Sequence, residues 1–181
     1  MALYIVPLYL FAIVGLSCEK SSASAGPEEI CVVQTEDIAI GSKLLTLSDA
    51  EEIMGEPAAL TCNMFTQKVD TLEYKSDYTA HSKDPVTGKT GKLYFMDEVY
   101  KTTTAAHDAY MGIFTANSTH AGFQPVQGLG DEAYYHTDGN NFYFYLVRKG
   151  TKMFRMKLNK VTSHSSEEAF KKAGRVITDR L

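Results

Sequence analysis

The sequence lacks the short motifs that most often indicate catalysis. Its five histidines show none of the spacings of zinc ligands, such as H-x-x-x-H, and it has no G-x-S-x-G motif for a serine nucleophile. Gly88-Lys89-Thr90 matches the end of a phosphate-binding loop, but Lys83 stands where that loop needs its first glycine. These absences favour a protein without catalytic residues, metal or cofactor. A small envelope hydrolase with a site assembled from dispersed residues is the alternative.

The chain also lacks a strong charge of either sign. Eighteen Lys and Arg against 22 Asp and Glu give a formal net charge of −4. Such a modest acidic balance gives no reason to expect nucleic acid as a partner. With 44% apolar and 22% charged residues, the composition is that of an ordinary globular protein.

Charge is absent altogether from Ala2 to Leu16. This apolar run of about 15 residues is too short to span a membrane, which takes roughly 20, but it has the length of a signal-peptide core. The run therefore predicts export.

The end of this run carries a cleavage motif. Gly15-Leu16-Ser17-Cys18 resembles a lipobox, the site at which bacterial lipoproteins are cut and acylated. The resemblance implies a signal peptide over 1–17, lipidation of Cys18, and a membrane-anchored protein of the cell envelope, on the periplasmic or the surface side. Cleavage after Ala23-Ser24-Ala25 is the alternative, and it would give a soluble secreted protein.

Cysteine is scarce, with three in the chain. Assigning Cys18 to lipid leaves Cys31 and Cys62, and two thiols in an oxidising compartment favour one disulfide. Two separate buried thiols are the alternative.

The remaining sequence reads as a tether and one domain. Residues 18–29 are small and polar without periodicity, which predicts a lipidated tether, and no second linker interrupts residues 30–181. Apolar spacing predicts helices over 47–55, over 102–116 and from Ser165, and strands over 59–66, 71–79, 92–99, 132–137, 141–147 and 151–158. This order, α-βββ-α-βββ-α, predicts a single α+β domain with an antiparallel sheet of about five to six strands and three helices.

Capping residues mark the predicted ends of two helices. Ser48 with Glu51, and Ser165 with Glu168, have the spacing of capping boxes. Gly55 has the position of a C-terminal cap for the first helix.

Several short motifs in this domain carry a resemblance to a known family. They are Leu45-Thr46, Asp49-Ala50 and Gly55, then Val126 with Gly128-Leu129-Gly130-Asp131-Glu132-Ala133, and finally Val147-Arg148-Lys149-Gly150. Together they resemble small, uncharacterised, exported PsbP-like α/β domains, over most of residues 44–180. The resemblance implies a mostly non-enzymatic protein, and no catalytic residue follows from it. The glycines could also reflect turn geometry alone.

The last two strands predict a candidate binding surface. If Arg148-Lys149-Gly150 is a three-residue loop, Val147 pairs with Thr151, and Phe144 lies opposite Phe154. The face away from these phenylalanines then carries Tyr134, His136, Tyr143, Tyr145, Arg155 and Lys157. Aromatic rings beside cations favour recognition of a glycan, a peptide or an envelope protein. Tyrosines on a solvated face, or on a face covered by a helix, are the alternative.

Overall fold

The structure, a computed structural model, describes residues 44–181. The predicted signal peptide, the tether with Cys18, and Cys31 lie outside the described residues. The Cys31–Cys62 disulfide therefore stays a prediction, with Cys62 buried at 3% exposure.

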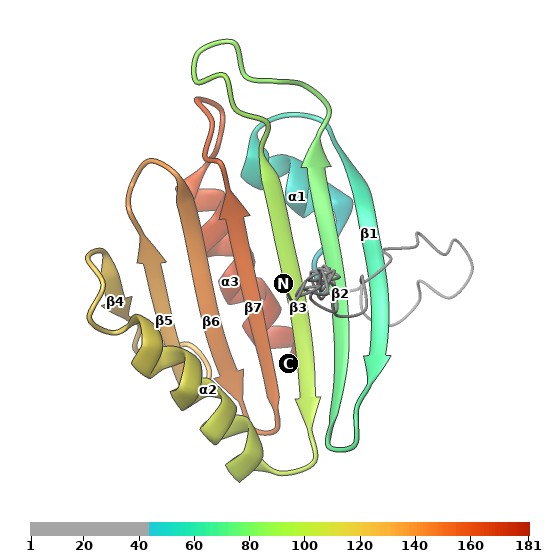
Figure 1. The fold of residues 1–181 in the computed structure, drawn as a ribbon, viewed down its shortest axis with the longest axis vertical. Coiled ribbons are helices and arrows are strands. Elements are labelled where there is room, and N and C mark those ends of the chain that lie inside the picture. The colour runs from blue at the N-terminus through green and yellow to red at the C-terminus, as the bar shows by residue number, and fades with distance from the viewer. Residues whose placement is uncertain (1–43) are drawn as a thin grey trace, which may run out of the picture. The chain divides into compact units, whose positions relative to one another are not determined.

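The described residues form an α+β domain built on one antiparallel sheet (Figure 1). Its helices are α1 (Leu47–Met54), α2 (Thr103–Asn117) and α3 (Glu167–Arg180), and its strands are β1 (Ala58–Gln67), β2 (Thr71–Ala80), β3 (Lys92–Tyr100), β4 (Phe123–Pro125), β5 (Glu132–Thr137), β6 (Phe142–Lys149) and β7 (Lys152–Asn159). The sheet has seven strands in the order β1-β2-β3-β7-β6-β5-β4. The α+β class is thus confirmed, but the strand count of five to six is wrong by the short edge strand β4.

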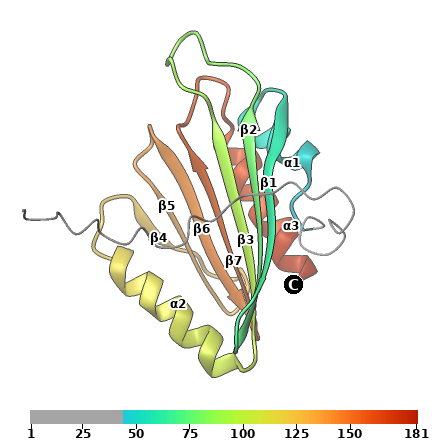
Figure 2. The same cartoon turned by 45° about the vertical axis from the view of Figure 1, so that its right-hand side comes forward.

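The two faces of the sheet are covered differently. Helices α1 and α3 lie on one face and α2 lies on the other, across the β5–β6 side (Figures 1 and 2). The first, the α1–α3 face, carries the row Tyr135, Tyr145, Met156 and Phe95. The second, the α2 face, carries the row Tyr134, Leu146, Arg155 and Met96. The larger core lies under α1 and α3, and a smaller apolar cluster lies under α2.

The ends of the helices are set by caps that differ in part from those predicted. Gly55 ends α1 in the left-handed region at φ 70°, as predicted. The capping box at its start is Thr46 with Asp49, whereas Glu51 accepts a hydrogen bond from the Ala58 N–H. The cap of α3 is Ser166, one residue beyond the predicted Ser165.

The β6–β7 hairpin corrects the predicted register. Lys149 pairs with Lys152, so the loop is the two-residue Gly150-Thr151, with Gly150 at φ 61°. Val147 therefore pairs with Phe154, three positions from the predicted Thr151. Because three is an odd number, the shift exchanges the faces of all β7 side chains relative to those of β6.

Candidate functional site

The corrected register divides the six predicted site residues between the two faces. Tyr134, His136, Arg155 and Lys157 lie on the α2 face, as the rows of paired residues show. Tyr143 and Tyr145 lie on the α1–α3 face, so the sequence analysis was wrong to place them with the other four.

Tyr143 and Tyr145 belong to the larger core. They are 6% and 3% exposed, and both rings contact Phe170 of α3. The Tyr145 and Phe170 rings are stacked, with an interplanar angle of 2°. A surface ligand therefore cannot reach them without moving α3.

Tyr134 has a supporting position on the α2 face. Its side chain is fully buried, and its ring contacts Tyr110 and Phe114 of α2 and Phe144 of β6. Burial raises the pKa of Tyr134 to about 12. The residue anchors α2 to the sheet rather than lining an open surface.

The other three predicted residues of this face line a hollow of about 270 Å³ beside α2. The full lining is Ile113, Asn117, His136, Phe142, Phe144, Arg155 and Lys157. The sequence analysis missed Ile113, Asn117, Phe142 and Phe144. Ile113 belongs to the apolar stripe of α2, which was visible in the sequence, but nothing local shows which strands that stripe meets.

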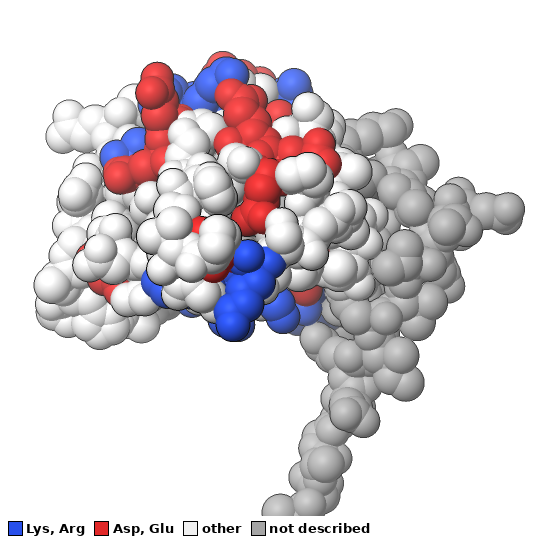
Figure 3. Space-filling model, turned by 90° about the horizontal axis from the view of Figure 1, so that it is seen from above, with Lys and Arg blue, Asp and Glu red and all other residues white. Residues whose placement is uncertain are grey.

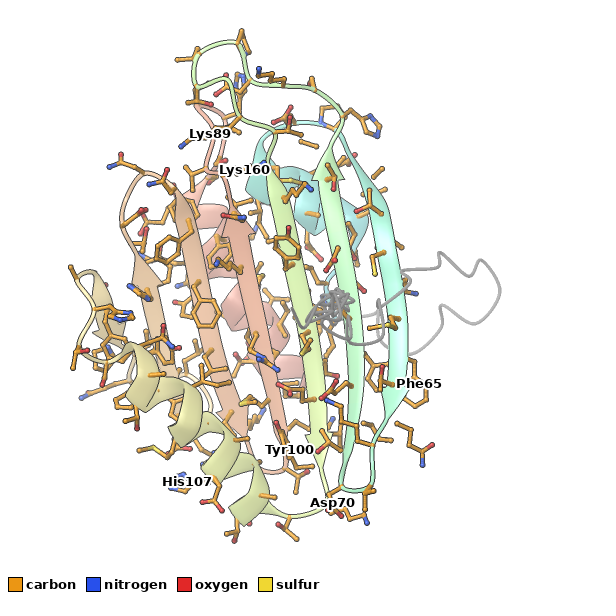
Figure 4. The ribbon with its side chains drawn as sticks, viewed as in Figure 1. Phe65, Asp70, Lys89, Tyr100, His107 and Lys160 are labelled. Atoms are coloured by element: carbon orange, nitrogen blue, oxygen red, sulfur yellow. The ribbon has the colours of Figure 1, made fainter. Side chains whose placement is uncertain are left out.

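Arg155 is held by a buried carboxylate. Its Nη2 donates a hydrogen bond to Glu98 Oε1 over 2.8 Å, and Tyr100 donates to the same oxygen over 3.1 Å. Burial raises the pKa of Glu98, and the guanidinium of Arg155 opposes the rise. Figure 4 shows Tyr100 at the end of β3, far from Lys89 and Lys160 at the other end of the sheet. Because Glu98 holds the guanidinium of Arg155, it fixes the position of this lining residue of the hollow and neutralises its charge.

Lys157 supplies a second cation with no carboxylate of its own. Its Nζ lies 5.5 Å from the centroid of the Phe142 ring. Within residues 44–181 it makes no hydrogen bond or ion pair. A second hollow, of about 140 Å³, adjoins on the β3 side and shares Arg155 and Lys157 with the first.

His136 is engaged with the backbone. It is 8% exposed, and its Nε2 lies 3.1 Å from the carbonyl oxygen of Ala121, so this nitrogen donates a hydrogen bond. The Phe142 ring meets the imidazole edge-on at 5.0 Å between centroids. The imidazole therefore serves as a wall of the hollow in this arrangement, with no hydroxyl or thiol bonded to it among the described residues.

Replacing Arg155 with methionine tests the role of the ion pair. The change leaves Glu98 buried without its counter-charge, which raises the pKa of this carboxyl further. A group whose pKa is higher in the folded than in the unfolded chain stabilises the fold at low pH, and this contribution is lost as the pH rises through the folded pKa. We expect Arg155→Met to cost about 2 kcal/mol more at pH 8 than at pH 5, as measured by urea unfolding.

A double variant provides the control for this experiment. In Glu98→Gln/Arg155→Met the carboxyl is gone, and the excess loss of stability at pH 8 should vanish. Equal destabilisation of the single variant at both pH values would contradict the assignment.

Asp131 and Glu132 meet at one arginine. Arg148 donates from Nε to Glu132 Oε2 over 2.5 Å and from Nη1 to Asp131 Oδ2 over 2.9 Å. Glu132 also contacts Nδ1 of His107, which lies on α2 (Figure 4). The network ties the start of α2 to the β5–β6 hairpin and thereby holds the helix beside the hollow.

Charged side chains also gather at the end of the sheet that carries the β2–β3 and β7–α3 loops, where acidic side chains form a broad patch with basic ones at its edges (Figure 3). Asp84 lies inside this end at 1% exposure and accepts hydrogen bonds from the backbone N–H groups of Ser163 and Val86, over 2.8 and 3.0 Å. The carboxylate joins the two loops and has a structural role.

The described part of the chain offers neither a metal-binding cluster nor a membrane-spanning helix. No group of three or more His, Cys, Asp and Glu side chains within residues 44–181 could hold a metal ion. None of α1, α2 and α3 is long and apolar enough to cross a membrane.

No protein-family model, curated protein or solved structure matches the chain.

Proposed function

We propose that this chain is a lipid-anchored protein of the bacterial cell envelope whose folded domain binds a ligand on the α2 face without catalysis. The observation that carries the binding role is the hollow of about 270 Å³ beside α2, which is lined by two cationic side chains and in which one of them, Lys157, stands over the Phe142 ring. Small-molecule pockets in proteins hold roughly 300–1,000 Å³ and combine apolar walls with a few polar groups. The hollow is slightly smaller than that range and has this composition.

The lipid anchor rests on the sequence of the first 18 residues. A mature lipoprotein carries two or three acyl chains on its first cysteine, and each buried CH₂ group contributes about 0.8 kcal/mol to membrane binding. The small polar residues 19–29 would then separate the domain from the bilayer.

Metabolic labelling tests the anchor. Cells that express the chain and grow with an alkyne-tagged fatty acid should yield a labelled protein, and Cys18→Ser should abolish the label because it removes the acceptor sulfur. Ala25→Leu, which destroys the alternative cleavage site, should leave the label unchanged. An unlabelled mature protein that begins at Gly26 would contradict lipidation and favour secretion.

Photo-crosslinking in growing cells tests the binding role. A photoreactive amino acid at position 117, which lines the hollow but is given no contact to the ligand, should produce a discrete adduct, measured by mass spectrometry of the intact protein. The matched control is position 83, because Lys83 is exposed and lies in the β2–β3 loop, away from the hollow. The same adduct at both positions, or none at position 117, would overturn binding at the α2 face.

A further inference from the structure

The charges that line the hollow have one sign. Its lining contains Arg155 and Lys157 but no Asp or Glu. Since Glu98 neutralises Arg155, the uncompensated charge at the hollow is close to that of the single Lys157 ammonium group. One positive charge matches a ligand with one negative charge.

Polar and apolar contacts occupy different parts of the lining. Lys157 and Arg155 come from β7, whereas Ile113 of α2 and Phe144 of β6 provide an apolar wall next to them. Phe144 is the direct neighbour of Lys157 across the β6–β7 pairing. A bound anion at Lys157 therefore lies beside two aromatic side chains: Phe144 on the neighbouring strand, and Phe142, whose ring centroid is 5.5 Å from Lys157 Nζ.

An unused donor supports an anionic ligand. Arg155 Nε is buried and has no hydrogen-bond partner among the described residues. A donor without an acceptor is unfavourable, and a ligand oxygen that met Arg155 as its guanidinium turned toward the hollow would satisfy it. The Asn117 side chain is committed, because its amide nitrogen donates to the Ile113 carbonyl oxygen over 2.7 Å.

We propose that the hollow binds a small amphiphilic monoanion, in which one carboxylate or similar oxyanion is joined to a compact apolar body such as a phenyl ring. The anion contacts Lys157 and Arg155, and the apolar body lies against Ile113, Phe142 and Phe144. This proposal rests on the proposed function, because it names the ligand class of the same site.

A pair of probes that differ only in charge tests the ligand class. 3-Phenylpropionate and its amide, 3-phenylpropanamide, have nearly the same size, and NMR shifts of backbone amides locate where each one binds to the ¹⁵N-labelled protein. We expect the acid to bind with a dissociation constant on the order of 1 mM, as a ligand of this size allows, and the neutral amide to bind at least fivefold more weakly. The shifted resonances should belong to β6, β7 and the second half of α2.

Three variants sharpen this experiment. Lys157→Gln should weaken binding of the acid about fivefold and leave the affinity for the amide unchanged. Only the acid carries a negative charge, so only the acid loses an ionic contact when Lys157 is replaced. Ile113→Trp fills the hollow and should remove the local shifts for both probes. Lys83→Gln changes the same charge away from the hollow and should have no effect.

The outcomes separate the two proposals. Equal affinity for acid and amide, or no effect of Lys157→Gln on the acid, would overturn the monoanion while leaving a binding site at the α2 face. Absence of local shifts with either probe, together with no adduct at position 117, would overturn the site itself.

Discussion

Replacing Phe170 with alanine should lower the free energy of unfolding by about 4 kcal/mol. Phe170 is 0% exposed, and its ring contacts Tyr135, Tyr143 and Tyr145 at centroid distances of 6.3, 5.7 and 5.9 Å. Removing a buried phenylalanine forfeits its transfer free energy and leaves a cavity, which together typically cost 3–5 kcal/mol. Urea unfolding followed by circular dichroism measures the loss.

Val176 provides a control on the same helix. It is 37% exposed, so Val176→Ala should cost about 1 kcal/mol or less. If the two variants lost similar amounts of stability, the tyrosines of β6 would not be part of the core. The tyrosine face predicted from the sequence would then have to be reconsidered.

Asp84→Asn should produce the second large effect, a fall of about 10 °C in the midpoint of thermal unfolding. The carboxylate of Asp84 accepts hydrogen bonds from Val86 and from both the backbone and the hydroxyl groups of Thr87 and Ser163. An asparagine would point its own N–H groups at some of these donors. The β2–β3 loop would then lose its connection to the β7–α3 loop.

The same variant should change the dependence of stability on pH. Hydrogen bonds from Ser163 and Thr87 hold the pKa of Asp84 well below its usual range. A carboxyl group with a lowered folded pKa stabilises the fold above its unfolded pKa, near 3.9, and this contribution is lost as the pH falls toward the folded value. The difference between wild type and Asp84→Asn should therefore shrink when the pH is lowered from 7 to 3.

Asp138 offers a matched control, because hydrogen bonds also hold its pKa below the usual range. Its partners Asn140, Asn141 and Phe142 all lie within four residues along the chain, and its turn is exposed. Asp138→Asn should lower the thermal midpoint by less than half as much. Equal shifts for the two variants would show that Asp84 does not join distant loops.

Local sequence patterns predicted the elements of the fold well. The periodic apolar residues of α2 and the glycine at position 55 are local signals. The predicted helix over 47–55 ends one residue late, and the one over 102–116 is shifted by one residue at both ends. Strand β4 was missed because three residues that include Pro125 carry no alternation. The pairing of β4 with β5, a strand that was predicted, becomes visible only in the fold.

The candidate site could be predicted only in part. The sequence placed Tyr134, His136, Arg155 and Lys157 on one face, which the pairing confirms. It failed for Tyr143 and Tyr145, because aromatic or aliphatic side chains occupy every position from 142 to 147, so neither face of β6 is polar. The face assigned to Tyr143 and Tyr145 relative to Arg155 and Lys157 then depended on the length of the β6–β7 loop. The prediction assumed three residues in this loop, whereas it has two, Gly150 and Thr151, so the pairing places the tyrosines on the other face.

The position of α2 over the sheet could not be predicted from the sequence either. That α2 lies over β5 and β6 depends on contacts between segments distant in the chain, such as those of Tyr110 and Phe114 with Tyr134. The hollow exists because α2 packs against Tyr134 and Leu146, while Arg155 and Lys157 stay at its margin.

The position of a bound probe tests the central claim most directly. Intermolecular nuclear Overhauser effects from the ring protons of 3-phenylpropionate should reach the methyl groups of Ile113 and the ring protons of Phe142 and Phe144. A small hollow of about 50 Å³ between α1 and α3, lined by Leu44, Val176 and Ile177, is the competing location. Effects to those three side chains instead would contradict binding at the α2 face.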